Sequence, residues 1–200
     1  MKKMFIITII LTLLLILGCS STKKVSRVGV DTNIDLSGRW NDVDSREVSK
    51  EIVKDIVSQN WLMNFVSENS ENPYVTVGTI RNLTSEHIQT ETFIKDIQRE
   101  LINSGKVHFV ASRDERSEIR QERLEQQSYA SEETAKRLAE EKGADFVLQG
   151  SISSIIDAAG GERVIYYQVN LQLVNIESNE TVWIGEKKHK KLVSKNKIKL

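Results

Sequence analysis

Apolar residues recur at helical spacing in the middle of the chain. In the first such segment they stand at Val48, Ile52 and Ile56, behind two aspartates that can cap a helix. In the second, Phe93 and Ile97 lie on one face, and a glycine follows where the helix should end. A third segment is helical by propensity but nearly devoid of apolar side chains. The predicted helices are 42–69, 90–105, 113–127 and 132–142.

Elsewhere apolar and polar residues alternate, which predicts strands. The single proline, Pro73, opens a β-branched run at a position where a missing N–H is tolerable. The pair Gly160-Gly161 marks a hairpin turn, and every second residue from Ile165 to Leu173 is apolar. The tail 187–200 is expected to be a frayed, lysine-rich end. The predicted strands are 28–36 at a sheet edge, 74–80, 106–111, 146–152, 165–173 and 181–184.

This order of elements predicts an α+β fold. Strands separated by helices favour parallel pairing, whereas the C-terminal hairpins require antiparallel pairing. The strand 165–173 has one polar and one apolar face, so helices should cover the apolar face only. We therefore expect a single domain with a mixed β-sheet packed against helices, whose C-terminal part consists of antiparallel hairpins.

The N-terminus has the pattern of a bacterial lipoprotein signal peptide. Two lysines precede an apolar stretch of 14 residues, 4–17, which is too short for a hydrocarbon core that requires ~20 residues. Ile16-Leu17-Gly18-Cys19 follows the pattern of a lipobox. Residues 1–18 should therefore be removed and Cys19 acylated, for example with palmitate. The alternative is an ordinary signal peptide with an incidental cysteine.

The organisation expected after the signal peptide is a short tether, 19–27, and a globular α+β domain, 28–200. Residues 20–35 are small or polar at first and contain no proline. Even fully extended, these residues reach only about 55 Å at ~3.4 Å each.

Charge and cysteine content exclude several classes of site. The sequence carries 28 basic and 28 acidic residues, and a net charge near zero argues against a nucleic-acid partner. Cys19 is the only cysteine, so neither a disulfide nor a cysteine-based metal site is expected. The three histidines lie far apart and no catalytic motif is recognisable. We therefore expect no metal, no cofactor, no catalytic residues and no enzymatic activity.

The segment 113–127 segregates its charges. On a helical wheel its four arginines fall on one stripe, and the acidic residues occupy the opposite side. Like charges at this spacing destabilise a helix by about 0.2–0.5 kcal/mol per pair, and only Ile119 and Leu124 could attach the helix to a core. Two interpretations remain open: a solvated helix with an accidental pattern, or a surface that binds an acidic partner. The candidate binding residues are Arg116, Arg120 and Arg123.

Three aromatic residues are further candidates. Trp40 stands just before a helix cap, where it can close the core or anchor a partner. Trp183 lies between Val182 and Ile184, so we expect it on the polar face of the sheet, together with Tyr166. On that face the two side chains would form an interface or be surface aromatics.

Several stretches resemble the LpoB-type outer-membrane lipoproteins, and together they span nearly all of the chain after residue 28. They include Asp-Leu-Ser-Gly-Arg-Trp at 35–40, Val-Gly-Thr-Ile-Arg-Asn at 77–82, Arg-Gln-Glu-Arg at 120–123, Gly-Ala-Asp-Phe at 143–146, Tyr-Tyr-Gln-Val at 166–169 and Val-Trp-Ile-Gly at 182–185. The resemblance implies a non-enzymatic lipoprotein that is anchored to the outer membrane by its lipid only and faces the periplasm. Its partner would be a penicillin-binding protein, a bifunctional peptidoglycan synthase, whose activation would regulate cell-wall synthesis and cell shape.

The tether departs from that family, whose best-known members have a long proline-rich linker. The runner-up resemblance is to CsgG-type secretion lipoproteins, through the stretch 143–152. Such a protein needs membrane hairpins with ~9–11 residues per strand, and no spare segments of that kind are recognisable. A cell-wall hydrolase, the third alternative, would need a set of catalytic residues that the sequence does not show.

Overall fold

The computed structural model describes residues 23–129 and 142–194 and divides the chain into two compact units, Met1–Thr32 and Asn33–Leu200. Three predicted features lie outside the described residues. They are the signal peptide, Cys19 and all but the last residue of the helix 132–142. The helices and strands described below all belong to the second unit.

The predicted edge strand 28–36 is wrong. Residues 23–41 form neither helix nor strand, and Val30 and Leu36 are 81% and 94% exposed. Alternation indicates which side chains would share a face, but a strand is stabilised by a neighbour with which it pairs. The sequence pattern carries no information about that neighbour.

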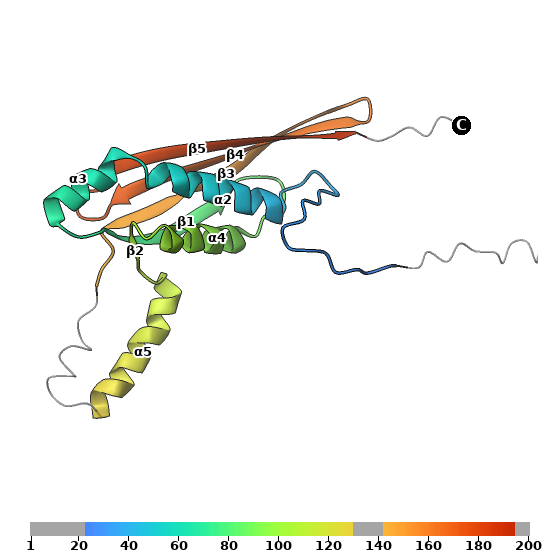
Figure 1. The fold of residues 1–200 in the computed structure, drawn as a ribbon. Coiled ribbons are helices and arrows are strands. Elements are labelled where there is room, and N and C mark those ends of the chain that lie inside the picture. The colour runs from blue at the N-terminus through green and yellow to red at the C-terminus, as the bar shows by residue number, and fades with distance from the viewer. Residues whose placement is uncertain (1–22, 130–141, 195–200) are drawn as a thin grey trace, which may run out of the picture. The chain divides into compact units, whose positions relative to one another are not determined.

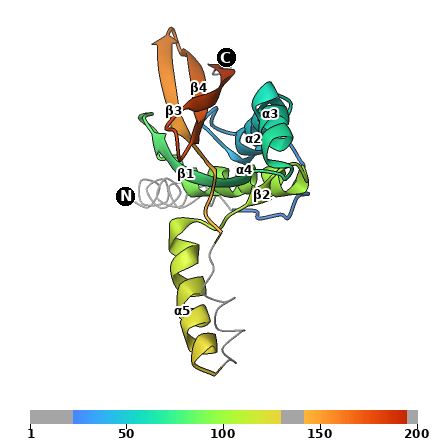
Figure 2. The ribbon, with the colours of Figure 1, turned by 90° about the vertical axis from the view of Figure 1, so that its left-hand side faces the viewer.

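Three helices lie against one face of the sheet (Figures 1 and 2). They are α2 (Asp42–Ile56), α3 (Asn60–Asn69) and α4 (Thr90–Asn103). A capping box begins α2, in which Asn41 Oδ1 accepts from the Asp44 N–H and Asp44 Oδ2 accepts from the Asn41 N–H. The prediction of α4 is confirmed.

The predicted helix 42–69 is interrupted between α2 and α3. The Trp61 indole N–H donates to the Ile56 carbonyl oxygen at 2.7 Å and so satisfies a group at the end of α2. Trp61 and Phe65 then pack edge-on against Phe146 of the sheet. These contacts make two helices more favourable than one, and the ring contacts depend on Phe146, which is far from the segment in the sequence.

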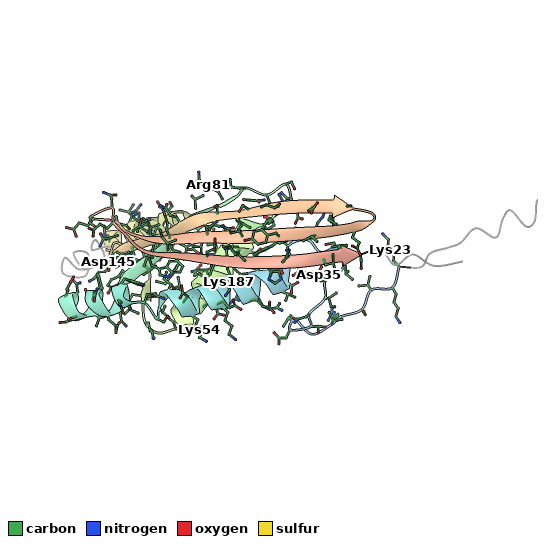
Figure 3. The ribbon with its side chains drawn as sticks, turned by 90° about the horizontal axis from the view of Figure 1, so that it is seen from above. Lys23, Asp35, Lys54, Arg81, Asp145 and Lys187 are labelled. Carbon is green, nitrogen blue, oxygen red and sulfur yellow. The ribbon has the colours of Figure 1, made fainter. Side chains whose placement is uncertain are left out.

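The five strands of the described part form one mixed sheet in the order β2-β1-β3-β4-β5. The pair β1–β2 and the pair β1–β3 are parallel, whereas β3, β4 and β5 form antiparallel hairpins, as predicted. Figure 3 shows the three long strands side by side. The strands are β1 (Tyr74–Asn82), β2 (His108–Phe109), β3 (Phe146–Ala159), β4 (Glu162–Asn175) and β5 (Thr181–Ser194).

The predicted frayed tail is also wrong over much of its length, because β5 continues to Ser194 and pairs with β4 as far as Glu162. Lysine lowers strand propensity, but continuous pairing with β4 outweighs this tendency.

The core lies between the helices and the apolar face of the sheet. On β4 this face consists of Ile165, Tyr167, Val169, Leu171 and Leu173, each at most 1% exposed. The opposite face is open and carries the polar residues of β4. The α+β fold with helices on the apolar face is therefore confirmed.

Candidate functional site

The arginine stripe of the sequence lines a groove beside the start of β1 and the end of β2. The helix that carries it is α5 (Arg113–Tyr129), which confirms the predicted helix 113–127. The groove has a volume of about 250 Å³. We call it the arginine groove; its lining residues are Tyr74, Phe109, Val110, Ala111, Arg116, Ile119, Arg120, Arg123 and Lys142.

Polar contacts hold the first turn of α5. The Ser112 N–H donates to Glu115 Oε2 at 2.8 Å, and Lys95 Nζ of α4 donates to Glu115 Oε1 at 2.6 Å. The hydrogen bonds from Lys95 and then from Ser112 lower the pKa of Glu115 to about 2. Glu115 therefore stays ionised and links α5 to α4.

The expected apolar attachment of α5 is wrong. Ile119 and Leu124 are 42% and 61% exposed, although Ile119 borders the arginine groove. Two apolar residues on an otherwise charged helix bury too little surface to hold it, so the contacts at Glu115 carry the attachment.

Aromatic and basic side chains form the wall of the groove opposite α5. This wall consists of Tyr74 of β1, the segment 109–111 and Lys142, and His108, which is not part of the lining, stacks on the Tyr74 ring with the centroids 4.8 Å apart. Lys142 Nζ lies 4.8 Å from the centre of the Tyr74 ring, within the range of a cation–π interaction. Three separate segments of the chain therefore supply this wall.

The electrostatic character of the arginine groove is one-sided. Among the residues that the structure describes, its lining includes four cationic side chains and no carboxylate. The Arg116 Nε is buried and has no hydrogen-bond partner among the described residues. Guanidinium groups bind carboxylates with two parallel hydrogen bonds. The groove can therefore bind an acidic group of a partner.

Tyr166, a second predicted binding residue, lies on the open face of the sheet. Its neighbours across the strands are Ile155 and Lys190, and its hydroxyl donates to Gln168 Oε1 at 3.2 Å. Ile155 is 68% exposed. The structure does not bring Tyr166 to the arginine groove.

The predicted orientation of Trp183 is wrong. It pairs with Leu173, so it points into the core and is only 6% exposed. Its indole N–H donates to Asp55 Oδ2 of α2 at 3.0 Å, and any side chain at position 185 would overlap its ring, which explains Gly185. Pairing with Leu173 fixes the face of Trp183, and the sequence of β5 alone cannot reveal that register.

Trp40 packs against the core, the first of its two alternatives. Its ring makes edge-on contacts with Phe93 and Tyr167, with centroids 5.8 and 5.6 Å apart. The Trp40 N–H donates to the Tyr167 hydroxyl at 2.9 Å, and that hydroxyl donates to Glu86 Oε2 at 2.7 Å. Burial and then the bond to Glu86 raise the pKa of Tyr167 above its usual range.

Sequence reasoning missed a buried cluster of charges around Lys191. Its Nζ lies 2.5 Å from Asp44 Oδ2 and 2.8 Å from Asp35 Oδ2. Asp44 is 2% exposed, and its other oxygen lies 3.2 Å from His189 Nε2. Burial opposes the charge of Lys191, but the two aspartates more than offset it, so the pKa of Lys191 is raised. No signal in the sequence points to this cluster, because pairing with Ile165 of β4 sets the face on which Lys191 lies.

The described residues contain neither a metal-binding cluster nor a membrane-spanning helix. No group of three or more His, Cys, Asp or Glu side chains in the described part could hold a metal ion. No described helix is both long enough and apolar enough to cross a membrane.

Comparisons with solved structures find similar proteins at low sequence identity. The LpoB C-terminal domain from Escherichia coli is 15% identical, with 73% of this chain and 98% of that chain covered and a TM-score of 0.44. The LpoB C-terminal domain from Salmonella enterica is 21% identical, with coverages of 67% and 93% and a TM-score of 0.34. Lipoprotein GNA1162 from Neisseria meningitidis is 12% identical, with coverages of 60% and 83% and a TM-score of 0.41.

These likenesses carry no functional argument, and no curated protein matches the sequence. The decisive comparison is with protein families. The family described as peptidoglycan-synthase activator LpoB matches residues 44–189, well over half of the chain. This match covers the whole of α2 except its first two residues, and all of the sheet except the end of β5. The chain therefore belongs to the LpoB family of peptidoglycan-synthase activators.

Proposed function

We propose that this protein is a non-enzymatic activator that binds a penicillin-binding protein, a bifunctional peptidoglycan synthase, through the arginine groove. The observation that carries the proposal is the gathering of Arg116, Arg120 and Arg123 in one groove whose described lining contains no carboxylate. The family match favours an activator over the secretion lipoprotein considered as an alternative.

The groove fits an acidic segment of the synthase. Segregating like charges along α5 destabilises the isolated helix, whereas an acidic partner neutralises them on binding. Arg116 has a buried Nε that a bound carboxylate can satisfy. Binding then supplies a hydrogen bond that the Arg116 Nε does not make with any described residue.

Activation follows from differential affinity. A protein that contributes no catalytic group stimulates an enzyme only by binding its more active state more tightly than its less active state. The groove would therefore contact a part of the synthase that moves between these states. Tyr166 on the open face is a second candidate contact.

The lipobox supports an anchor at Cys19, with the domain facing the periplasm from the outer membrane. A short tether limits the distance between the domain and that membrane. The partner must therefore reach toward the outer membrane with the domain that binds the groove.

The proposal is tested by reversing the charge of the groove. The triple substitution Arg116→Glu, Arg120→Glu and Arg123→Glu should weaken binding to the purified penicillin-binding protein of the same organism at least tenfold, about 1.4 kcal/mol. Glycan polymerisation by the synthase should lose its stimulation in parallel. The difference from wild type should be larger at low salt, where exposed charges are least screened.

The matched control is Glu118→Lys with Glu122→Lys, which reverses charge on the opposite side of α5. It should retain binding and stimulation. If the triple variant loses secondary structure by circular dichroism, Arg120→Gln with Arg123→Gln replaces it. Full stimulation by a folded groove variant would refute the proposed role of the groove.

A further inference from the structure

The outer half of β3 lacks a neighbour on one side. The strand β1 pairs with β3 only from Phe146 to Ile152, whereas β3 continues to Ala159 in unbroken pairing with β4. Among the described residues, no strand pairs with Ser153–Ala159 on the side of β1. We call these seven residues the β3 edge.

The direction of the backbone groups along the β3 edge follows from one hydrogen bond. The Leu83 N–H donates to the Ile152 carbonyl oxygen at 2.8 Å, so the backbone groups of Ile152 point toward β1. In an antiparallel pair, alternate residues direct both groups to the same side. The N–H and C=O groups of Ser154, Ile156 and Ala158 therefore point away from β4. Such a row of groups is a template for another strand.

The side chains of the β3 edge do not prevent pairing. Ile155 is 68% exposed on the open face and Ile156 is 43% exposed on the other face. The opposite edge of the sheet differs, because β5 has lysine at four of the five positions 187–191. Charged residues, lysine above all, are a common means of blocking strand addition at an edge. The β3 edge carries one charged residue, Asp157, whereas the β5 edge carries this run of lysines.

The size of the β3 edge decides what it can bind. Seven residues span about 24 Å, and a sheet is roughly 10 Å thick, which gives an edge of about 240 Å². A stable interface between two folded proteins needs about 800 Å² on each partner. The edge alone is too small to hold a second folded copy, but it suits one extended segment of a partner that is bound elsewhere on the molecule.

We infer that the β3 edge accepts an extended segment of the synthase as an added strand. The segment would present backbone groups to Ser154, Ile156 and Ala158. Small or apolar side chains at alternate positions would contact Ile155 on one face and Ile156 on the other. This inference rests on the proposed function, because the arginine groove supplies the contact that brings the synthase into place.

Amide hydrogen exchange tests the inference directly. Isotope-labelled protein is measured alone and with the purified penicillin-binding protein. Strand addition should slow exchange of the Ser154, Ile156 and Ala158 amides at least tenfold. The amides of Lys188 and Lys190 on the β5 edge should not change.

Two substitutions with matched controls test the same contact by affinity. Ile156→Pro removes an outward N–H, and proline is tolerated at a sheet edge when its missing N–H faces solvent. Lys190→Pro removes an outward N–H on β5 and is its control. Ile155→Lys places a charge beside the β3 edge without altering the backbone, and Ile184→Lys changes an equally exposed isoleucine of β5. The β3 variants should bind the synthase at least tenfold more weakly, and the β5 variants should bind as wild type does.

The outcomes separate this inference from the proposed function. Normal binding by folded Ile155→Lys, with unchanged exchange at the β3 edge, would overturn strand addition and leave the arginine groove intact. Protection of the β3 edge that rises with protein concentration in the absence of synthase would assign the edge to a second copy and overturn the inference. Absence of any synthase binding by the wild type would overturn both.

Discussion

Single residues of β5 show where sequence patterns stop being informative. Lys191 stands in a lysine-rich stretch that looks solvated, yet its side chain is 9% exposed and contacts Asp44. Trp183 stands between two apolar residues and was expected on the polar face, yet it points into the core. Both placements depend on the register with β4, which no feature within β5 specifies.

The buried charge of Lys191 should matter for stability. Lys191→Met removes the cation beside a carboxylate that is only 2% exposed. The expected loss in the free energy of unfolding is about 3 kcal/mol, the low end for breaking a buried ion pair, because the Asp44 carboxylate keeps the hydrogen bond from the Asn41 N–H and a contact with His189. Urea denaturation measures this loss.

Lys190→Met is the control for that substitution, because Lys190 lies on the opposite face of the same strand. A surface change of this kind should alter the free energy of unfolding by at most about 0.5 kcal/mol. Equal losses for both variants would mean that the ion pair contributes nothing beyond strand packing.

At the scale of elements, periodicity predicts α4 and the hairpins well. Their apolar positions repeat over many residues. Gly105 marks the end of α4 and Gly160-Gly161 the first hairpin turn, whereas polar residues at 177–180 mark the second. The sequence does not predict the interruption between α2 and α3 or the true length of β5, because contacts with distant residues, Phe146 and the strand β4, contribute to them. The sequence also predicts the arginine stripe, because all of its residues lie on one helix. It does not predict the opposite wall of the groove, because the residues of that wall come from three other segments of the chain.

The attachment of α5 should depend on pH through Glu115. Its pKa of about 2 in the folded protein is below the ~4.3 of an unperturbed glutamate. Ionised Glu115 therefore stabilises the attachment fully above about pH 4.3, and this contribution is lost as the pH falls toward 2. Glu115→Gln mimics the protonated side chain.

Hydrogen exchange in the first turn of α5 measures that dependence. At pH 6 the first turn should exchange faster in Glu115→Gln than in wild type, and the difference should vanish near pH 2. Glu118→Gln on the same helix should follow wild type throughout. A difference between wild type and Glu115→Gln that persists at pH 2 would contradict the assigned cause.

At the scale of the whole molecule, the proposed attachment to a membrane depends on the N-terminus. Cys19 is the only cysteine and is the last residue of the lipobox. Cys19→Ala should therefore abolish labelling by a fatty-acid analogue and release the protein from the membrane fraction, because acyl chains are the expected source of its membrane affinity. Ser21→Ala should leave both unchanged. Continued labelling of the Cys19 variant would exclude lipidation at this residue.

The ion pair between Lys191 and Asp44 also has a consequence for folding kinetics. It joins residues 147 apart in the sequence, whereas the hairpins β3–β4 and β4–β5 pair adjacent segments. Contacts at long separation form late, because the entropy of closing the loop is lost before they stabilise the chain. The sheet should therefore assemble around the hairpins, and the start of α2 should dock afterwards. Weakening the ion pair would then shorten the lifetime of the folded state and leave the rate of folding nearly unchanged.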